Sequence, residues 1–388
     1  MSISITQDQN SSISESFAEI KKLEEKLRSV VLPRDLLQKG LDMLKRLENV
    51  IKFGGYSQEF EPIAKYIEWI TQIPWRKYTR DNLDIDNVKE ELDKHHYGLE
   101  DTKLRILEYL AVMKLNTTET SDPQKLTDDN QVDVSTNMQT LKGSSANAPI
   151  LCFVGIQGIG KTSMAKSIAN ALGRKFYRIS LGGLTSVTAL RGIARGNPDA
   201  EPGQVVKGLV RTKVMNPLIL FDEVDKVSEQ SGARADVMAS LLEILDPEQN
   251  TTFIDHYIDF PIDLSQTMFI TTANNIGGIS VALLDRLEVI RFSSYSDDDK
   301  IQIGKFYILP KVKELAGLSS EDIIIEDNVW PLIVRPLGFD AGIRELERTI
   351  TRLCRKVAMM KIQGKVDRVL ITTENFRQFI PEDFGIVG

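Results

Sequence analysis

Residues 155–162 read Gly-Ile-Gln-Gly-Ile-Gly-Lys-Thr, which matches the phosphate-loop pattern GxxxxGK[ST]. Glycines in such a loop let the backbone N–H groups turn around an anion. Lys161 is expected to reach the β- and γ-phosphates, and the Thr162 hydroxyl is expected to ligate Mg²⁺. The pattern therefore predicts that ATP with Mg²⁺ is bound by the loop residues Gly155, Gln157, Gly158, Ile159, Gly160, Lys161, Thr162 and Ser163.

The sequence on both sides of the loop supports this hypothesis. An apolar run with β-branched residues precedes it at 149–154, as expected for a buried parallel strand. Residues 163–172 follow with helical periodicity, and Gly173 is expected to end that helix. A strand, a glycine loop and a helix N-terminus together form a phosphate-binding context. The alternative is a glycine-rich turn in a doubly wound sheet.

Two adjacent carboxylates, Asp222 and Glu223, follow the apolar run 217–221. Neighbouring residues of a strand point to opposite faces, so two acids at a strand end are expected to have different tasks. Asp222 is predicted to hold Mg²⁺, through water or directly, and Glu223 is predicted to orient and polarise the attacking water. The alternative is a solvated acidic strand end.

A third polar position, Asn274, follows the apolar stretch 269–273. An asparagine after a strand is most often a turn residue. In series with the two preceding motifs, it is predicted to bond the γ-phosphate or the attacking water.

The chain that must position these residues divides by composition into five segments. Apolar runs at 150–154, 176–180, 217–221, 268–272 and 289–292 alternate with helical stretches, which predicts an α/β core with a parallel sheet over 149–293. The remainder, 294–388, is predicted to be a small α-helical domain, with long helices at 297–316 and 342–362 and a strand at 369–371.

Upstream of the core, a helical arm is predicted over residues 15–115. Packing within a helical hairpin explains its apolar spacing better than a coiled coil, because the heptads are few. Residues 1–14 and 116–148 are rich in small polar residues, and both are expected to be disordered.

Composition excludes several classes of function. The net charge of −7 gives no overall support for nucleic-acid binding, and three histidines are too few and too scattered for a metal site. Two cysteines form no disulfide framework, which suggests a reducing compartment. No apolar run approaches the length that spans a membrane, and the first 20 residues have no leader pattern, so a cytoplasmic protein is expected.

Longer stretches resemble the ATPase module of the Lon proteases, a family of AAA+ ATPases. The similar stretches outside the phosphate loop are 73–75, 96–99, 181–183, 241–250, 269–274, 283–290 and 341–348. They follow one another in the family's order and extend over about 15–385, apart from 116–148. The resemblance implies an AAA+ P-loop NTPase core, preceded by a helical arm and followed by an α-helical lid.

The resemblance also implies roles that spacing alone does not give. By resemblance, Tyr97, Gly98 and Leu99 lie beside the adenine. Arg286 is similar to the arginine finger that reaches the γ-phosphate of a neighbouring subunit, and Arg344 is similar to the second sensor. The implied partners are further copies of the chain in a ring, expected to be a hexamer, and unfolded or damaged protein; a separate protease subunit or domain is a further candidate.

The chain departs from the family pattern in three places. Ile156 and Gln157 replace two prolines of the phosphate loop, so the loop is expected to bind but to be less rigid. Asn197 and Pro198 replace an aromatic–aliphatic pair that grips substrate, with Asp199 and Glu201 close by. The chain stops at Gly388, where the family's Ser-Lys protease domain would begin, so no peptidase activity is expected from it alone.

Three hypotheses about function follow. The preferred one is an ATPase module that hydrolyses ATP to drive protein unfolding or translocation. The altered loop favours a second, a degenerate protease-less paralogue that binds nucleotide and serves as an assembly or regulatory subunit. The third is a DNA-associated ATPase, which the acidic net charge weakens.

Overall fold

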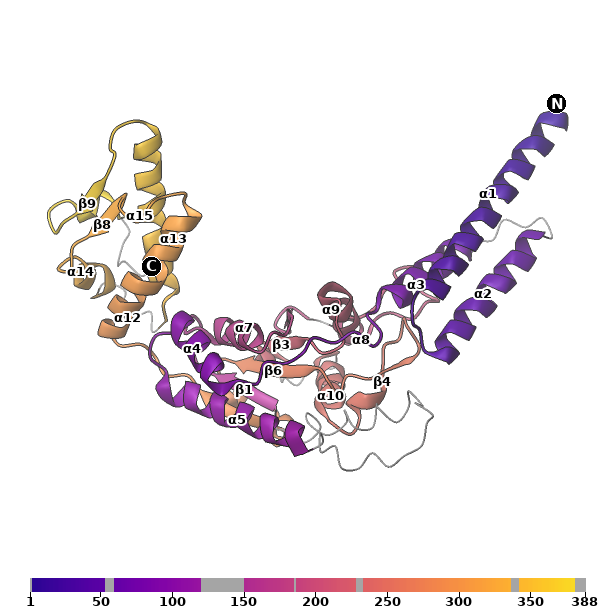
Figure 1. Cartoon of the computed structure of the whole chain (residues 1–388), viewed down its shortest axis with the longest axis horizontal. Coiled ribbons are helices and arrows are strands. Elements are labelled where there is room, and N and C mark those ends of the chain that lie inside the picture. The colour runs from indigo at the N-terminus through magenta and orange to yellow at the C-terminus, as the bar shows by residue number, and fades with distance from the viewer. Residues whose placement is uncertain are drawn as a thin grey trace.

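The protein is described by a computed structural model over residues 2–52, 59–119, 150–184, 186–227, 233–335 and 342–380. Its shape is elongated, with an α/β core between a projecting pair of N-terminal helices at one end and a helical lid at the other (Figure 1). None of the described helices is long and apolar enough to cross a membrane.

The core is a five-stranded parallel sheet with the strand order β2-β3-β6-β1-β7. Its strands are β1 (Ile150–Val154), β2 (Phe176–Ser180), β3 (Leu218–Asp222), β6 (Met268–Ala273) and β7 (Leu287–Arg291). Strands β1, β3 and β6 are buried along their whole length, as expected when helices cover both faces of a parallel sheet. This confirms the predicted α/β class.

The register of the sheet brings the predicted polar residues to one edge. Ser180 pairs with Asp222 across β2 and β3, and Val154 pairs with Ala273 across β1 and β6. The phosphate loop after β1, the two acids at the end of β3 and Asn274 after β6 therefore meet at the carboxyl ends of adjacent strands. Ligands bind at this edge in open α/β sheets.

Short elements complete the core around this sheet. Its helices are α7 (Lys161–Ala171), α8 (Thr188–Arg191), α9 (Gln204–Thr212), α10 (Ala233–Leu245) and α11 (Val281–Leu284). The core also contains the short 3₁₀ turns η3 (Val224–Lys226), η4 (Asn250–Thr252) and η5 (Ile276–Gly278). Strands β4 (Phe253–Ile254) and β5 (Pro261–Ile262) pair antiparallel beside the main sheet.

Two helices that we predicted in the arm pack on the core instead. Helices α4 (Ile85–His95) and α5 (Glu100–Glu119) place Val88, Leu92 and Ile106 in the same buried cluster as the strand residues Leu151 and Phe153. Helical periodicity shows that a helix has an apolar face, but it does not show which surface covers that face. Residues 120–149, most of the predicted insertion, lie outside the described residues.

The arm itself consists of α1 (Ser2–Ser29), α2 (Arg34–Lys52) and α3 (Phe60–Gln72), which pack on one another as a hairpin with a third helix. Helix α1 begins at Ser2, so the segment 2–14, which we expected to be disordered, is helical here. Once the packed half of a helix has formed, each further residue adds a hydrogen bond without a new nucleation cost.

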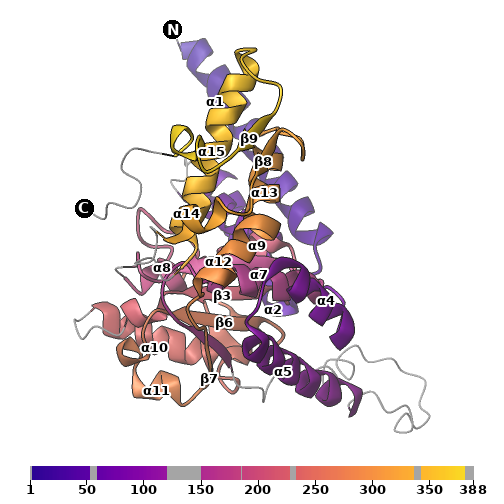
Figure 2. The same ribbon diagram turned by 90° about the vertical axis from the view of Figure 1, so that its left-hand side faces the viewer.

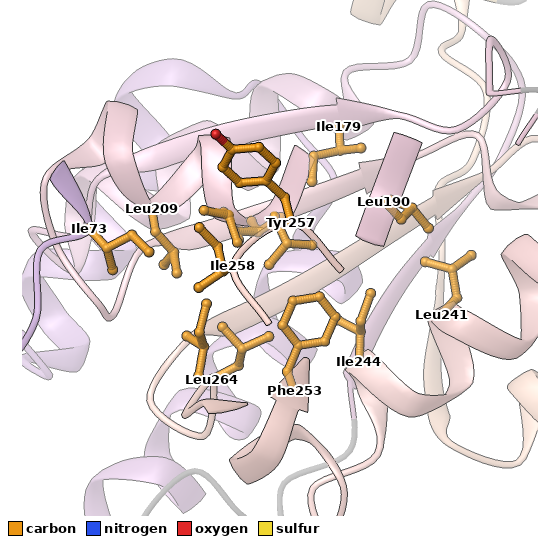
Figure 3. Close-up of a cluster of buried hydrophobic side chains, with 14 of the residues drawn as sticks. Ile73, Ile179, Leu190, Leu209, Leu241, Ile244, Phe253, Tyr257, Ile258 and Leu264 are labelled. Carbon is orange, nitrogen blue, oxygen red and sulfur yellow. The ribbon is translucent and has the colours of Figure 1, made fainter. Parts of the chain in front are cut away.

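The arm is joined to the core by apolar packing. Ile73, just after α3, belongs to a buried cluster with residues of α9, α10 and the β4–β5 region, namely Leu209, Leu241, Ile244, Phe253, Ile258 and Leu264 (Figure 3). The Trp75 indole N–H donates to the carbonyl of Ile70 at 2.8 Å, which fixes the chain as it leaves α3. The base of the arm is therefore part of the core.

The lid begins with α12 (Asp297–Ile303), which continues through a π-turn, η6 (Gly304–Ile308), into α13 (Leu309–Leu315). Gly304 lies against the Trp330 indole, so a Cβ there would come within 2.6 Å of the ring. The rest of the lid is β8 (Ile323–Ile325), α14 (Trp330–Val334), α15 (Arg344–Ile362), β9 (Val369–Ile371) and η8 (Phe376–Gln378). The predicted helices and the strand at 369–371 are present; β8 and α14 were not predicted.

Candidate nucleotide-binding site

A cavity of about 690 Å³ lies at the carboxyl edge of the sheet, between the core, the α4–α5 junction and the lid. Figure 2, which faces the lid end, shows α12 above α7 with α4 beside it. Of the predicted residues, the cavity is lined by Tyr97, Gln157, Gly158, Gly160, Lys161, Thr162, Ser163, Asp222, Glu223, Asn274 and Arg344. The predicted residues that do not line it are Gly98, Leu99, Gly155, Ile159 and Arg286.

The phosphate loop has the backbone conformation that its glycines allow. Gly158 and Gly160 have φ values of +83° and +93°, in the left-handed region that favours glycine. Gly160 directly precedes α7, so the first N–H groups of that helix face the cavity. These groups and the helix dipole make a site for an anion.

Gly155 and Ile159 support the loop without lining the cavity. The Ile159 side chain is fully buried in the core cluster under the sheet edge. A Cβ at Gly155 would come within 2.8 Å of the Phe292 carbonyl oxygen, so this position has no room for a side chain. The Ile159 side chain thus supports the loop from beneath, and the contact of these two residues with nucleotide stays a prediction.

Lys161 and Asn274 are brought together by the loop and β6. The Lys161 ammonium donates to the carbonyls of Gly155 and Ile156, the latter at 2.9 Å, and to Asn274 Oδ1 at 3.0 Å. Burial lowers the pKa of Lys161, while the nearby carboxylates of Asp222 and Asp225 raise it. The cation therefore lies on the floor of the cavity, where it can meet phosphate oxygens.

Asp222 and Thr162 face each other as predicted for a magnesium site. Thr162 Oγ1 lies 3.4 Å from Asp222 Oδ2, and the Thr272 hydroxyl donates to Asp222 Oδ1. Mg²⁺ is bound by few protein oxygens, and it keeps several waters and phosphate oxygens. These two oxygen donors beside a phosphate loop fit that ion, although the described residues hold no cluster of three metal-binding side chains.

Glu223 reaches the cavity by a route that we did not predict. We expected strand alternation to place Asp222 and Glu223 on opposite faces, yet both line the same cavity. Glu223 has left the strand with a φ of +64°, and its N–H donates to Thr272 Oγ1 at 3.0 Å. A non-glycine residue in this conformation is strained, and such strain is often found at functional sites.

The lid closes the cavity at the phosphate loop. The Ile343 N–H donates to the Gly158 carbonyl at 3.1 Å, and the next residue, Arg344, begins α15. A Cβ at Gly158 would lie 3.1 Å from Arg344 Cγ, so the arginine stem rests on this glycine. Arg344 is therefore held against the phosphate loop, where it lines the cavity.

Tyr97, Gly98 and Leu99 form the turn between α4 and α5. Gly98 and Leu99 have φ values of +63° and +58°, which turn the chain sharply. Only Tyr97 lines the cavity; its ring meets that of Tyr307 from the lid, with centroids 6.3 Å apart. Leu99 packs instead against the buried cluster beneath. The predicted contact of Gly98 and Leu99 with the adenine stays a prediction.

Arg286 lies outside the cavity of its own chain. It follows α11, and its guanidinium donates to the Ala282 carbonyl at 2.9 Å and contacts Asp246 Oδ2 at 3.2 Å. Its side chain is 36% exposed, so it remains accessible from outside. This location leaves its own nucleotide site without it.

Comparison with known proteins bears directly on this geometry. Residues 151–295 match the model of the ATPase family associated with various cellular activities (AAA), and residues 314–369 match that of the Lon protease AAA+ ATPase lid domain. The chain is an AAA+ ATPase module of the Lon family. The two matches cover the cavity from both sides, since the first contains the phosphate loop and the second contains Arg344.

Curated relatives agree with this assignment. The Lon protease of Desulforamulus reducens is 41% identical over 348 residues, 90% of this chain and 39% of the relative. The human protein described as "Lon protease homolog, mitochondrial" is 37% identical over 363 residues, 93% of this chain and 34% of the relative. The chain thus spans about two fifths or less of the length of these relatives.

The Lon-type cavity also contains residues that the sequence analysis missed. Arg178 from β2 binds Asp222, and His96 lies buried with Nε2 2.9 Å from Ser167 Oγ. Burial lowers the pKa of His96 to about 4, so the ring is neutral at pH 7. Tyr295, at the junction of core and lid, donates to the Ile159 carbonyl at 3.1 Å. None of these residues lies in a recurring pattern; only the neighbouring histidines were a visible signal.

Proposed function

We propose that this Lon-type module hydrolyses ATP in the presence of Mg²⁺ and uses the motion that follows to unfold or translocate protein. The observation that carries the proposal is the convergence of Lys161, Thr162, Asp222, Glu223 and Asn274 on one cavity, with Arg344 of the lid at its mouth.

The chain's own residues divide the work of phosphoryl transfer. The loop N–H groups and Lys161 hold the phosphates, and Thr162 and Asp222 would hold Mg²⁺, which neutralises charge on the phosphates when bound. Glu223 accepts a proton from, or orients, the water that attacks the γ-phosphate. Asn274, bonded to Lys161, fixes that water or the γ-phosphate. Arg344, the first residue of α15, contacts the γ-phosphate, so that the lid responds to its presence.

Arg286 completes the site of a neighbouring copy in this proposal. Its position outside its own cavity supports action in trans, in a ring that we expect to be a hexamer. A cation at the developing charge of the transition state is worth about 10³–10⁵ in rate. Isolated monomers should therefore hydrolyse ATP slowly, and specific activity should rise with protein concentration.

A complementation experiment tests action in trans. The Glu223→Gln variant cannot hydrolyse ATP at its own site, but it still offers Arg286 to a neighbour. The Arg286→Ala variant keeps its own site, but it cannot offer the arginine to a neighbour. Each variant alone should have little activity, and an equimolar mixture should regain a substantial part of it. A mixture that co-assembles by sedimentation yet stays inactive would contradict the assignment of Arg286.

The regulatory-subunit hypothesis is retained because one observation favours it. Residues 196–199 of the loop between α8 and α9 are all exposed, and the tip carries Asn197 and Pro198. These side chains offer little stacking to an extended polypeptide.

The basic test is an ATPase assay on the purified chain, with EDTA as the control for metal dependence and Lys161→Ala as the control for contamination. Steady hydrolysis that requires Mg²⁺ supports the catalytic proposal. Nucleotide binding without hydrolysis at any protein concentration would favour the regulatory subunit. A salt-dependent DNA titration tests the DNA-associated alternative, which the net charge weakens.

A further inference from the structure

Arg178 makes an ion pair with the carboxylate that we assign to Mg²⁺. Its Nε lies 2.7 Å from Asp222 Oδ2, and its Nη2 lies 2.6 Å from the same oxygen. This is the oxygen that faces the Thr162 hydroxyl at 3.4 Å. The other oxygen, Oδ1, is bound by Thr272. A guanidinium thus occupies the side of the carboxylate that a metal ion would approach.

The fold gives the two partners of this pair different freedom. The Asp222 side chain is 7% exposed, and it is fixed between β3, β6 and the start of α7. The Arg178 side chain projects from the neighbouring strand β2 and is 49% exposed. It also lines the nucleotide cavity. The aspartate is therefore held in place, while the arginine can leave it at little cost.

Two cations cannot share one carboxylate oxygen without mutual repulsion. Mg²⁺ usually keeps several waters, so the ion or one of its waters would need the carboxylate lone pairs that the guanidinium occupies. When no metal is bound, however, a buried Asp222 beside Glu223 would repel the phosphates of a nucleotide. A cation that can leave Asp222 would neutralise the carboxylate when no metal is bound and would not compete with the metal once it binds.

We propose that Arg178 is a displaceable counterion of Asp222: it neutralises and orients the carboxylate while the metal is absent, and it moves away into the cavity when Mg²⁺ binds. The inference rests on the proposed function, since it assumes that Asp222 is a metal ligand. Arg178 is a positioning residue in this scheme, because it acts through Asp222. Its loss should strengthen metal binding and weaken the binding of nucleotide without metal.

These opposite effects can be measured without turnover. Mn²⁺ binding to the ADP-bound protein is followed by the loss of the free-ion signal in electron paramagnetic resonance, and ADP binding in EDTA is followed by calorimetry. In Arg178→Gln, the Mn²⁺ dissociation constant should fall about two- to fivefold and the metal-free ADP dissociation constant should rise about two- to fivefold, the range of a half-exposed ion pair. Arg178→Lys should lie between this variant and the wild type.

Lys166 provides the matched control. It is an exposed cation that lines the same cavity from α7. Among the described residues, the hydrogen bonds to the Asp222 carboxylate come from Thr162, Arg178 and Thr272. Lys166→Gln removes the same charge and should leave the Mn²⁺ dissociation constant of the ADP complex unchanged within about a factor of two. An Asp222→Asn background should abolish the effect of Arg178→Gln on Mn²⁺.

The outcomes separate this inference from the proposed function. If the wild-type chain binds neither ADP nor Mn²⁺–ADP, the proposed function fails. If it binds both and Arg178→Gln binds Mn²⁺ more weakly or equally well, with an unchanged thermal unfolding curve, the counterion role is refuted. Weaker Mn²⁺ binding would instead mean that the arginine holds Asp222 in its ligand geometry and stays beside the metal.

Discussion

Two regions of the AAA+ core differ in how closely they match the Lon family. One is the nucleotide cavity, and the other is the loop between α8 and α9, residues 192–203. In the cavity, the residues that the proposed chemistry requires are present and converge on one edge of the sheet. In the loop, Asn197 and Pro198 stand where an aromatic–aliphatic pair is expected. The cavity therefore keeps the residues that the chemistry requires, despite Ile156 and Gln157 in its phosphate loop, whereas the second loop lacks the expected aromatic–aliphatic pair.

The base of the loop is nevertheless firmly built. The Ile193 N–H donates to the Glu201 carbonyl at 2.9 Å, and the Gly203 N–H donates to the buried carboxylate of Asp255 at 2.7 Å. The arm also holds it: the Arg195 guanidinium lies over the Tyr66 ring of α3, 4.2 Å from its centroid. This contact holds the loop against the base of the arm.

The difference shows where sequence change is tolerated. A cavity side chain can both hold the fold and take part in the assigned chemistry, as Asp222 does through its contacts with Thr272 and Thr162. The exposed tip of the loop contributes little to packing, so its side chains can change without loss of the fold. Function at the tip is thus decided by what those side chains touch in a substrate.

The largest expected effect on nucleotide affinity is confined to the cavity. Lys161→Ala should weaken ATP binding about 10- to 100-fold, because a hydrogen bond to a charged group is worth about 1.5–3 kcal/mol. Fluorescent-nucleotide titration measures it, with Lys166→Ala as the control for loss of a cavity cation. Equal losses in the two variants would mean that general charge, and not the position of Lys161, determines affinity.

The contributions of the two regions to the free energy of unfolding should change with pH in opposite directions. Burial lowers the pKa of His96 in the cavity from 6.5 to about 4. Its contribution to stability is present above pH 6.5 and is lost as pH falls toward 4. Between pH 7.5 and 5 the wild type should lose about 2 kcal/mol that His96→Gln does not lose. Urea unfolding at the two pH values measures this difference.

Asp255 at the base of the loop gives the opposite slope. Burial raises its pKa from 3.8 to about 6, against the three backbone N–H groups that bond it. Its contribution to stability is therefore present below pH 4 and is lost as pH rises through 6. Relative to Asp255→Asn, the wild type should gain about 1 kcal/mol between pH 7 and 5. The assignments would be contradicted if the stability of the wild type, relative to His96→Gln and relative to Asp255→Asn, changed with pH in the same direction.

The smallest effect concerns the loop tip. Asn197→Tyr with Pro198→Val should raise the stimulation of ATPase activity by unfolded protein about two- to tenfold, since an aromatic contact adds about 0.5–1.5 kcal/mol. Asp199→Asn with Glu201→Gln separates the effect of charge from that of apolar contact. Strong unfolding of a folded substrate by the unmodified chain would show that another segment grips the polypeptide.

Local patterns predicted much of this structure because they act over short distances. The strands at 150–154 and 369–371 were predicted at their observed bounds, since a short apolar run between turns has few other structures open to it. The placement of Lys161, Asp222 and Asn274 at one sheet edge also followed, because parallel strands align their carboxyl ends.

What could not be predicted depends on contacts between distant segments. The packing of α4 and α5 on the core, the partnership of Arg178 with Asp222 and the burial of His96 against Ser167 join residues far apart in the chain. The left-handed backbone at Glu223 arises from the turn after β3 and from Thr272, and no single-residue preference indicates it. Family resemblance indicated Arg344 and Tyr97, but it did not show that Tyr97 lines the cavity while Gly98 and Leu99 do not.

The central claim is that binding and hydrolysis of ATP are performed by different residues of one cavity. Glu223→Gln tests it most directly, because glutamine keeps the shape of the side chain and removes only its capacity as a base. The measurement is ATP affinity by titration and single-turnover hydrolysis on the same sample. We predict affinity within about twofold of the wild type and hydrolysis slower by about 10²–10⁴. Unchanged hydrolysis in that variant would contradict the account.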